Sequence, residues 1–144
     1  MSKPLRLALL SSDVPRAQAA AAELARKHDW VPLDEADAAV VLGGDGFMLQ
    51  ELHRMLDAGR VIPAYGLNHG TVGFLMNNPE GRRSIAERVA RAKPVAVAPL
   101  EMTALTNGGR EQRYYAINEV SLLRETRQTA KLEVLVNGKV RIAE

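Results

Sequence analysis

The residues in this chain that are best suited to chemistry are one carboxylate, Asp45, and the three glycines around it, Gly43, Gly44 and Gly46. Glycine has no Cβ atom, so three glycines in four positions let another molecule's phosphates approach the backbone closely. A carboxylate at such a place repels phosphates, and therefore needs a task of its own. Asp45 either caps the helix that follows, since Asp is a preferred N-cap residue, or accepts a proton from a hydroxyl that attacks a phosphoryl group.

The sequence on either side of this turn predicts a strand before it and a helix after it. Residues 38–42 are apolar without alternation, as in a parallel strand that is covered on both faces. Apolar residues then return at helical spacing over residues 47–55, so the N–H groups of the turn lie at the positive end of a helix, which favours an anion. The turn is neither a G-x-x-x-x-G-K-[ST] nor a G-x-G-x-x-G motif, because Phe47, Met48 and Leu49 follow Gly46.

A second glycine-rich segment, residues 68–78, follows the next expected strand at residues 61–66. Its Phe74 and Leu75 offer an apolar surface on which an adenine or nicotinamide ring could lie. The residues by themselves favour the plainer alternative, in which this pair fills the hydrophobic core.

Asn118 and Glu119 interrupt an expected strand at residues 114–123, although both residue types have low strand propensity. One interpretation is an outward-facing polar pair on an edge strand. The other is a pair of side chains that accept hydrogen bonds from the two vicinal hydroxyls of a ribose.

Three segments of the chain resemble motifs of the NAD kinases. Residues 43–46 (GGDG) resemble the motif that these enzymes share with diacylglycerol-type lipid kinases. Residues 66–75 (GLNHGTVGFL) resemble the family's G-x-N-x-G-x-x-G-F-L segment, and residues 116–120 (AINEV) its A-x-N-[DE]-V segment. Three motifs in the same order over nearly the whole chain make the resemblance specific, although Phe47 stands where the family usually has threonine.

The resemblance implies a kinase that phosphorylates the 2′-hydroxyl of the adenosine ribose of NAD, with ATP or polyphosphate and a divalent metal such as Mg²⁺, to give NADP. Asp45 would be its catalytic base. The residues that would contact the nucleotides are Gly43, Gly44, Gly46, Asn68, Phe74, Asn118 and Glu119. No side chain is assigned to the metal. The alternatives are a non-catalytic NAD(P)-binding fragment and, less favoured, a lipid-type kinase that shares GGDG.

The alternation of strands and helices predicts an α/β fold with a Rossmann-like parallel sheet and helices on both faces. We expect this α/β domain to occupy residues 1–93, with a short strand at residues 30–33 and its last helix starting at Asn78–Pro79. Residues 94–144 predict the start of an antiparallel β domain, in which Asn137–Gly138 is a hairpin turn. Because the family's further glycine- and Ser/Thr-rich segment does not follow, we expect this β domain to be incomplete.

Composition excludes several other classes of protein. No apolar run approaches the ~20 residues that span a bilayer. A net charge of +2 with 4% aromatic residues argues against nucleic-acid binding. The absence of cysteine fits a cytoplasmic protein. An unpaired β edge predicts a homo-oligomer.

His53 lies on the polar side of the helix that follows the glycine turn. We therefore expect its side chain to face solvent.

Overall fold

The computed structural model describes residues 4–71 and 73–142 of the chain. Its elements in chain order are β1 (Leu7–Ser11), α1 (Pro15–Ala25), β2 (Ala38–Gly43), α2 (Asp45–Asp57), β3 (Ala64–Asn68), β4 (Met76–Asn77), α3 (Ile85–Arg91), β5 (Leu100–Leu105), β6 (Glu111–Ala116), β7 (Val134–Val136) and β8 (Lys139–Ile142).

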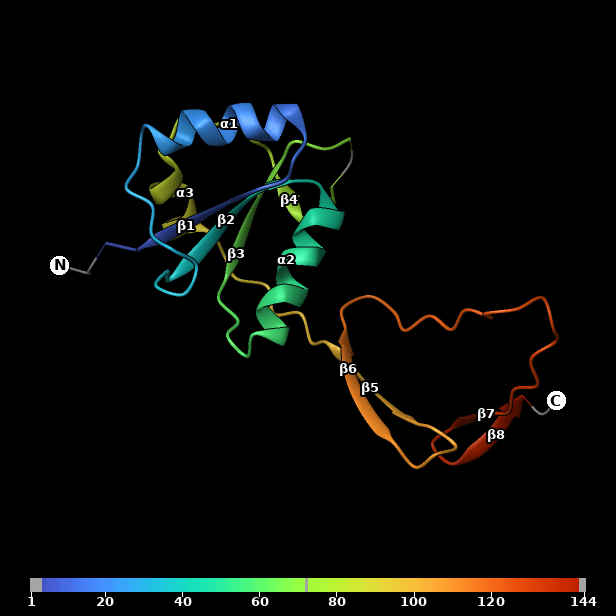
Figure 1. Cartoon of the computed structure of the whole chain (residues 1–144). Helices are drawn as coiled ribbons and strands as arrows, with labels where there is room; N and C mark the ends of the chain where they lie inside the picture. The colour runs from blue at the N-terminus through green and yellow to red at the C-terminus, as the bar shows by residue number, and fades with distance from the viewer. Residues whose placement is uncertain (1–3, 72, 143–144) are drawn as a thin grey trace.

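Strand β2 is one of the two inner strands of the parallel sheet in the α/β part (Figure 1). The sheet has the order β1-β2-β3-β4, and every neighbouring pair is parallel. All six residues of β2 are buried, which confirms the prediction from its uninterrupted apolar run. Because the strands are parallel, their carboxyl ends meet at one edge, where ligands of such sheets bind.

Alternate residues of β2 serve two hydrophobic clusters, one on each face of the sheet. Val40 and Leu42 pack with Ala17 of α1 and Ile85 of α3. Ala39 and Val41 face the other way and pack in the cluster that contains Met48 and Met55 of α2. The helices therefore cover both faces, as the sequence predicts.

The predicted strand at residues 30–33 is wrong. Only an isolated bridge joins Trp30 to Leu7 among the described residues, with the N–H of Val31 donating to the Leu7 carbonyl at 3.0 Å. Pro32 follows at once and has no N–H to continue a ladder.

The last helix of the α/β part also begins later than predicted, at Ile85 rather than at Asn78–Pro79. Asn78 does use its side chain, but Oδ1 accepts from the N–H of Glu80 in a local turn. The helix begins instead at a capping box, in which Ser84 accepts from the Glu87 N–H and the Glu87 carboxylate accepts from the Ser84 N–H.

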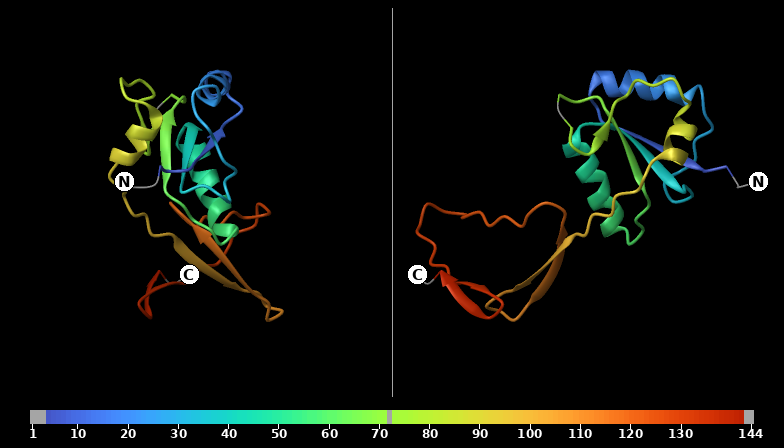
Figure 2. Two further views of the ribbon diagram at one scale, coloured as in Figure 1. Left: turned by 90° about the vertical axis from the view of Figure 1, so that its left-hand side faces the viewer. Right: turned by 180° about the vertical axis from the view of Figure 1, so that it is seen from behind.

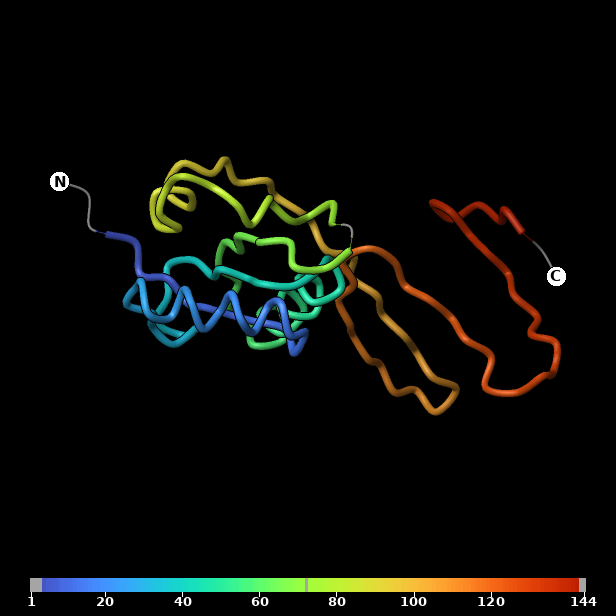
Figure 3. The backbone as a smooth tube through the Cα atoms, turned by 90° about the horizontal axis from the view of Figure 1, so that it is seen from above, coloured from blue at the N-terminus to red at the C-terminus, as the bar shows by residue number. Residues whose placement is uncertain are grey.

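Beyond α3 the chain forms two antiparallel hairpins, β5–β6 and β7–β8, that lie to one side of the parallel sheet (Figures 2 and 3). Asn137 (φ 52°) and Gly138 (φ 74°) form the tight turn of the second hairpin, as predicted for Asn-Gly. The expected strand at residues 114–123 ends early, at Ala116. The two hairpins form separate sheets, so this β region is incomplete as a layer, in agreement with the predicted fold class.

Within residues 4–71 and 73–142, no helix is both long and apolar enough to cross a membrane.

Candidate functional site

The two glycine-rich segments meet at the carboxyl edge of the sheet. Gly43 at the end of β2 pairs in register with Asn68 at the end of β3, and the N–H of His69 donates to the Gly43 carbonyl at 2.7 Å. A Cβ atom on Gly70 would lie 3.1 Å from the Cα of Gly44, so the backbones of the two segments touch. Segments that are separate in sequence therefore form one surface.

Asp45 links these segments through its side chain. Helix α2 has Gly44 as its N-cap and Asp45 as its first residue, so the carboxylate does not cap the helix in the way the first alternative supposed. Its Oδ2 accepts from the N–H of Phe74 at 2.7 Å, and its Oδ1 accepts from the N–H of Leu75 at 2.9 Å. A carboxylate offers about four lone-pair sites, so Asp45 keeps acceptor capacity for a further partner.

The three glycines around Asp45 differ in what a side chain would meet. A Cβ on Gly43 would lie 3.0 Å from Cδ1 of Phe47, so a side chain there would press on Phe47 and force its ring to shift. A Cβ on Gly44 would make an ordinary contact at 3.7 Å with Gly70, and a Cβ on Gly46 would have no described protein atom within 4 Å. Protein packing therefore does not explain glycine at positions 44 and 46, and the space beside them is open.

Phe74 does not fill the core. The residue is 93% exposed and Leu75 is 42% exposed, although the N–H groups of both donate to Asp45. The plainer alternative for this pair is therefore wrong. An aromatic ring stands in solvent beside the glycine turn.

Asn68 uses its side chain to shape its own loop. Its Oδ1 accepts from the N–H of Gly70 at 3.0 Å, which forms an Asx turn. This turn brings Gly70 against Gly44. The observed role of Asn68 is to set the loop beside the Asp45 turn.

Positive charge lies beside the same edge. His69 is close enough to Arg16, in the first turn of α1, for the two to interact electrostatically. Partial burial, and then the Arg16 guanidinium, lower the pKa of His69 below its ordinary value. At neutral pH the imidazole is therefore neutral, and Arg16 is the permanent cation here.

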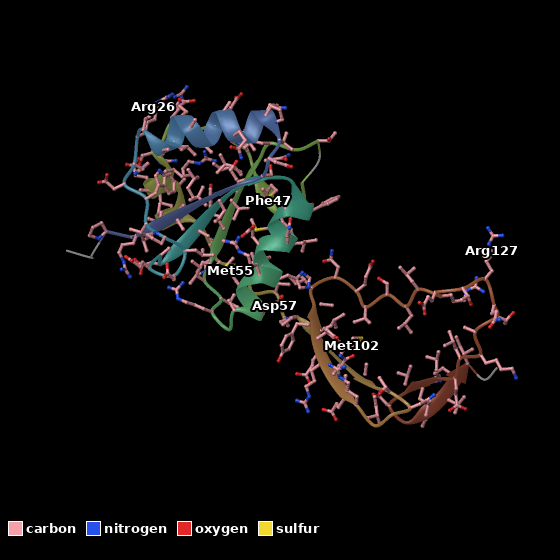
Figure 4. The ribbon with its side chains drawn as sticks, in the orientation of Figure 1. Arg26, Phe47, Met55, Asp57, Met102 and Arg127 are labelled. Atoms are coloured by element: carbon pink, nitrogen blue, oxygen red, sulfur yellow. The ribbon has the colours of Figure 1, made fainter. Side chains whose placement is uncertain are left out.

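No described hydrogen bond or ion pair joins Asn118 or Glu119 to the Asp45 turn. Both are exposed and follow the end of β6, and neither has a hydrogen-bond partner within the described residues. Figure 4 shows Phe47 and Asp57 at opposite ends of α2, with the Asp57 end nearer to β5, which carries Met102. The ribose-holding role of Asn118 and Glu119 stays a prediction.

A metal centre made of protein side chains alone is not found in the described ranges, where no three His, Cys, Asp or Glu side chains gather. Asp45 is the carboxylate at the glycine turn. A magnesium ion commonly takes one or two carboxylates together with substrate phosphates, and Asp45 fits that limited role.

Sequence reasoning missed His53. It predicted a solvated side chain, but Nε2 lies 3.1 Å from the carbonyl oxygen of Tyr115 on β6, and Nδ1 lies 3.2 Å from that of Leu49. A histidine on the polar side of a helix gives no sign in the sequence of such a distant partner.

The chain resembles curated proteins over nearly its whole length. An NAD kinase of Zymomonas mobilis is 52% identical over 140 residues, which is 96% of this chain and 54% of the relative. NAD kinases of Rhizorhabdus wittichii (51% identical over 96% of this chain) and Cereibacter sphaeroides (48% over 98%) show the same relation, each matched over 54% of its own length. No family model matches the chain.

The fold and site define an α/β protein with a glycine-rich turn at the carboxyl edge of a parallel sheet, the edge at which ligands bind in this class. The comparisons then point to one family. Over nearly its whole length the chain is similar to NAD kinases, and it spans about half the length of the curated relatives that it matches.

Proposed function

We propose that this chain carries the catalytic turn of an NAD kinase, which phosphorylates the 2′-hydroxyl of the adenosine ribose of NAD with ATP or polyphosphate to give NADP. The observation that carries the proposal is Asp45. Its carboxylate lies at the start of α2, beside two glycines whose missing side chains protein packing does not require. The family relationship supports the choice of substrate.

In this mechanism Asp45 is the catalytic base. Its two backbone donors orient the carboxylate, and the remaining lone pairs accept the proton of the attacking hydroxyl. The N–H groups of the glycine turn and the positive end of α2 bind phosphate oxygens of the donor. The exposed ring of Phe74 borders the NAD pocket, and Asn118 and Glu119 hold a ribose.

When bound, a divalent cation, which we propose to be Mg²⁺, would neutralise charge on the transferred phosphoryl group. No cluster of His, Cys, Asp or Glu among the described residues could hold the ion by itself, so Asp45 would hold it together with phosphate oxygens of the substrate. Asp45 would therefore act both as the base and as a ligand of the cation, and mutation of the carboxylate would remove both roles.

The direct test is formation of NADP from NAD, ATP and Mg²⁺ by the purified protein, with circular dichroism to show that it is folded. We expect turnover that Asp45→Asn lowers by about 10²–10⁴-fold, the usual contribution of a positioned base. Turnover with a diacylglycerol and no dependence on NAD would support the lipid-type kinase instead.

The second candidate function is nucleotide binding without catalysis. It needs only the glycine turn and the positive end of α2 as an anion site, and no proton transfer by Asp45. Equilibrium dialysis with labelled NAD distinguishes the two, because a binding fragment retains NAD but produces no NADP. Saturable NAD binding by folded protein without any turnover would replace the kinase proposal with this one.

We also propose that the chain associates with copies of itself through the β region. The supporting observation is a set of exposed apolar side chains on these strands: Leu105, Val134, Leu135, Val136, Val140 and Ile142. Light scattering after size exclusion tests this, and a mass of 15.7 kDa at tens of micromolar would refute it. A division into domains at residue 93 and a cytoplasmic location remain part of the proposal.

A further inference from the structure

His53 connects the two parts of the molecule. Among the hydrogen bonds of residues 4–71 and 73–142, its contact with Tyr115 is the only one by a side chain that joins the α/β part to the β region. It spans 62 positions in sequence. His53 lies eight residues after Asp45 on α2, which is about 12 Å along the helix axis.

The chemistry of the ring fits this connection. A carbonyl oxygen only accepts, so the contact with Tyr115 requires the proton on Nε2. The tautomer with the proton on Nε2 donates across to β6, and its Nδ1, which then carries no proton, lies 3.2 Å from the Leu49 carbonyl oxygen without donating to it. Strand β6 pairs with β5 along one edge, and the Tyr115 carbonyl is the group through which a side chain of α2 hydrogen-bonds it.

The position of Tyr115 limits the position of the pair that follows it. Asn118 is three residues further along and Glu119 four, so a fully extended chain places them within about 10–14 Å of Tyr115. Fixing Tyr115 against α2 therefore confines both side chains relative to Asp45, the first residue of the same helix.

We propose that His53 is a positioning residue, which holds β6 against α2 through the Tyr115 carbonyl and so sets where Asn118 and Glu119 stand relative to Asp45. The geometric part of this inference is independent of any reaction. The consequence for NAD rests on the proposed function.

Distance measurements test the geometric part without any nucleotide. The chain contains no cysteine, so Ala22→Cys on α1 and Asn107→Cys at the tip of the β5–β6 hairpin, both exposed, can carry two spin labels. We expect one narrow distance distribution, which His53→Leu broadens at least twofold. His53→Gln, whose amide N–H can donate to the same carbonyl, restores the narrow distribution.

The matched control is Gln50→Leu, the same kind of change at an exposed position of the same helix. It should leave the distribution narrow. Equal widths in the parent, His53→Leu and Gln50→Leu would overturn the proposal, as would broadening in His53→Gln equal to that in His53→Leu.

Kinetics test the consequence for the substrate. In active protein, loss of one neutral hydrogen bond, worth about 1 kcal/mol, should raise the KM for NAD about fivefold in His53→Leu, with kcat within twofold of the parent. An unchanged KM in a variant with a broadened distance distribution would overturn the positioning role. Absence of NADP formation in the parent protein would refute the proposed function, and the label distances would still decide the role of His53.

Discussion

Replacement of Asp45 by asparagine should separate the structural and chemical duties of this carboxylate. Asparagine has a single side-chain oxygen, so it can keep one of the two backbone hydrogen bonds, to Phe74 or to Leu75, and must present an NH₂ group to the other N–H. A hydrogen bond to a charged acceptor contributes about 1.5–3 kcal/mol. Because this segment is exposed and water can replace the lost acceptor, we expect a loss near the lower end, about 1.5 kcal/mol.

The loss is local, so the domain should stay folded. A typical domain has about 5–15 kcal/mol of unfolding free energy, and 1.5 kcal/mol is a fraction of it. Hydrogen exchange measures the local effect directly. The Phe74 and Leu75 amides should exchange about tenfold faster in Asp45→Asn, since tenfold corresponds to about 1.4 kcal/mol.

The control is Asp57→Asn, which removes an exposed carboxylate from the other end of the same helix. It should leave exchange at both amides unchanged. Equal exchange rates in the parent and in Asp45→Asn would refute the role of Asp45 in holding this loop. Parent-like turnover in folded Asp45→Asn would refute its role as the base.

Gly46→Ala should raise the free energy of unfolding by up to about 1 kcal/mol, because alanine favours a helix and its Cβ has open space. The same change should weaken ATP binding, measured by calorimetry. Gly43→Ala should instead destabilise the fold in urea titrations, and equal effects of the two changes would contradict this account of the glycines. Phe74→Ala should change stability by less than about 0.5 kcal/mol, since the ring is exposed, but raise the KM for NAD; a large loss of stability would contradict the observed exposure. The depressed pKa of His69 means that the unfolded chain binds its proton first, so stability is full above about pH 6.5 and falls as the pH drops below it. His69→Gln should flatten that slope in urea titrations at pH 7.5 and 5.5, and a slope equal to the parent's would show that another group is responsible.

The sequence alone determined those features that depend on local pattern. The apolar run of β2, the helical spacing after Gly46 and the Asn137–Gly138 turn each reflect a preference of neighbouring residues, and the structure shows all three. Local rules failed where signals competed. Asn78–Pro79 has the pattern of a helix start, but the helix begins after Ser84, because the capping box there satisfies two backbone donors at once.

Only the tertiary structure decided which distant groups meet. Asp45 holds the N–H groups of Phe74 and Leu75 across 29 and 30 positions, because β2 and β3 end side by side and the loop from β3 to β4 passes the start of α2. The sequence also does not decide whether Phe74 is buried. An aromatic residue is usually buried, and the exposure of Phe74 depends on the loop that carries it. His53 looks like a solvated residue until β6 lies beside it. Residue type and spacing fix which groups are available, whereas the packing of strands and helices fixes the partners they contact.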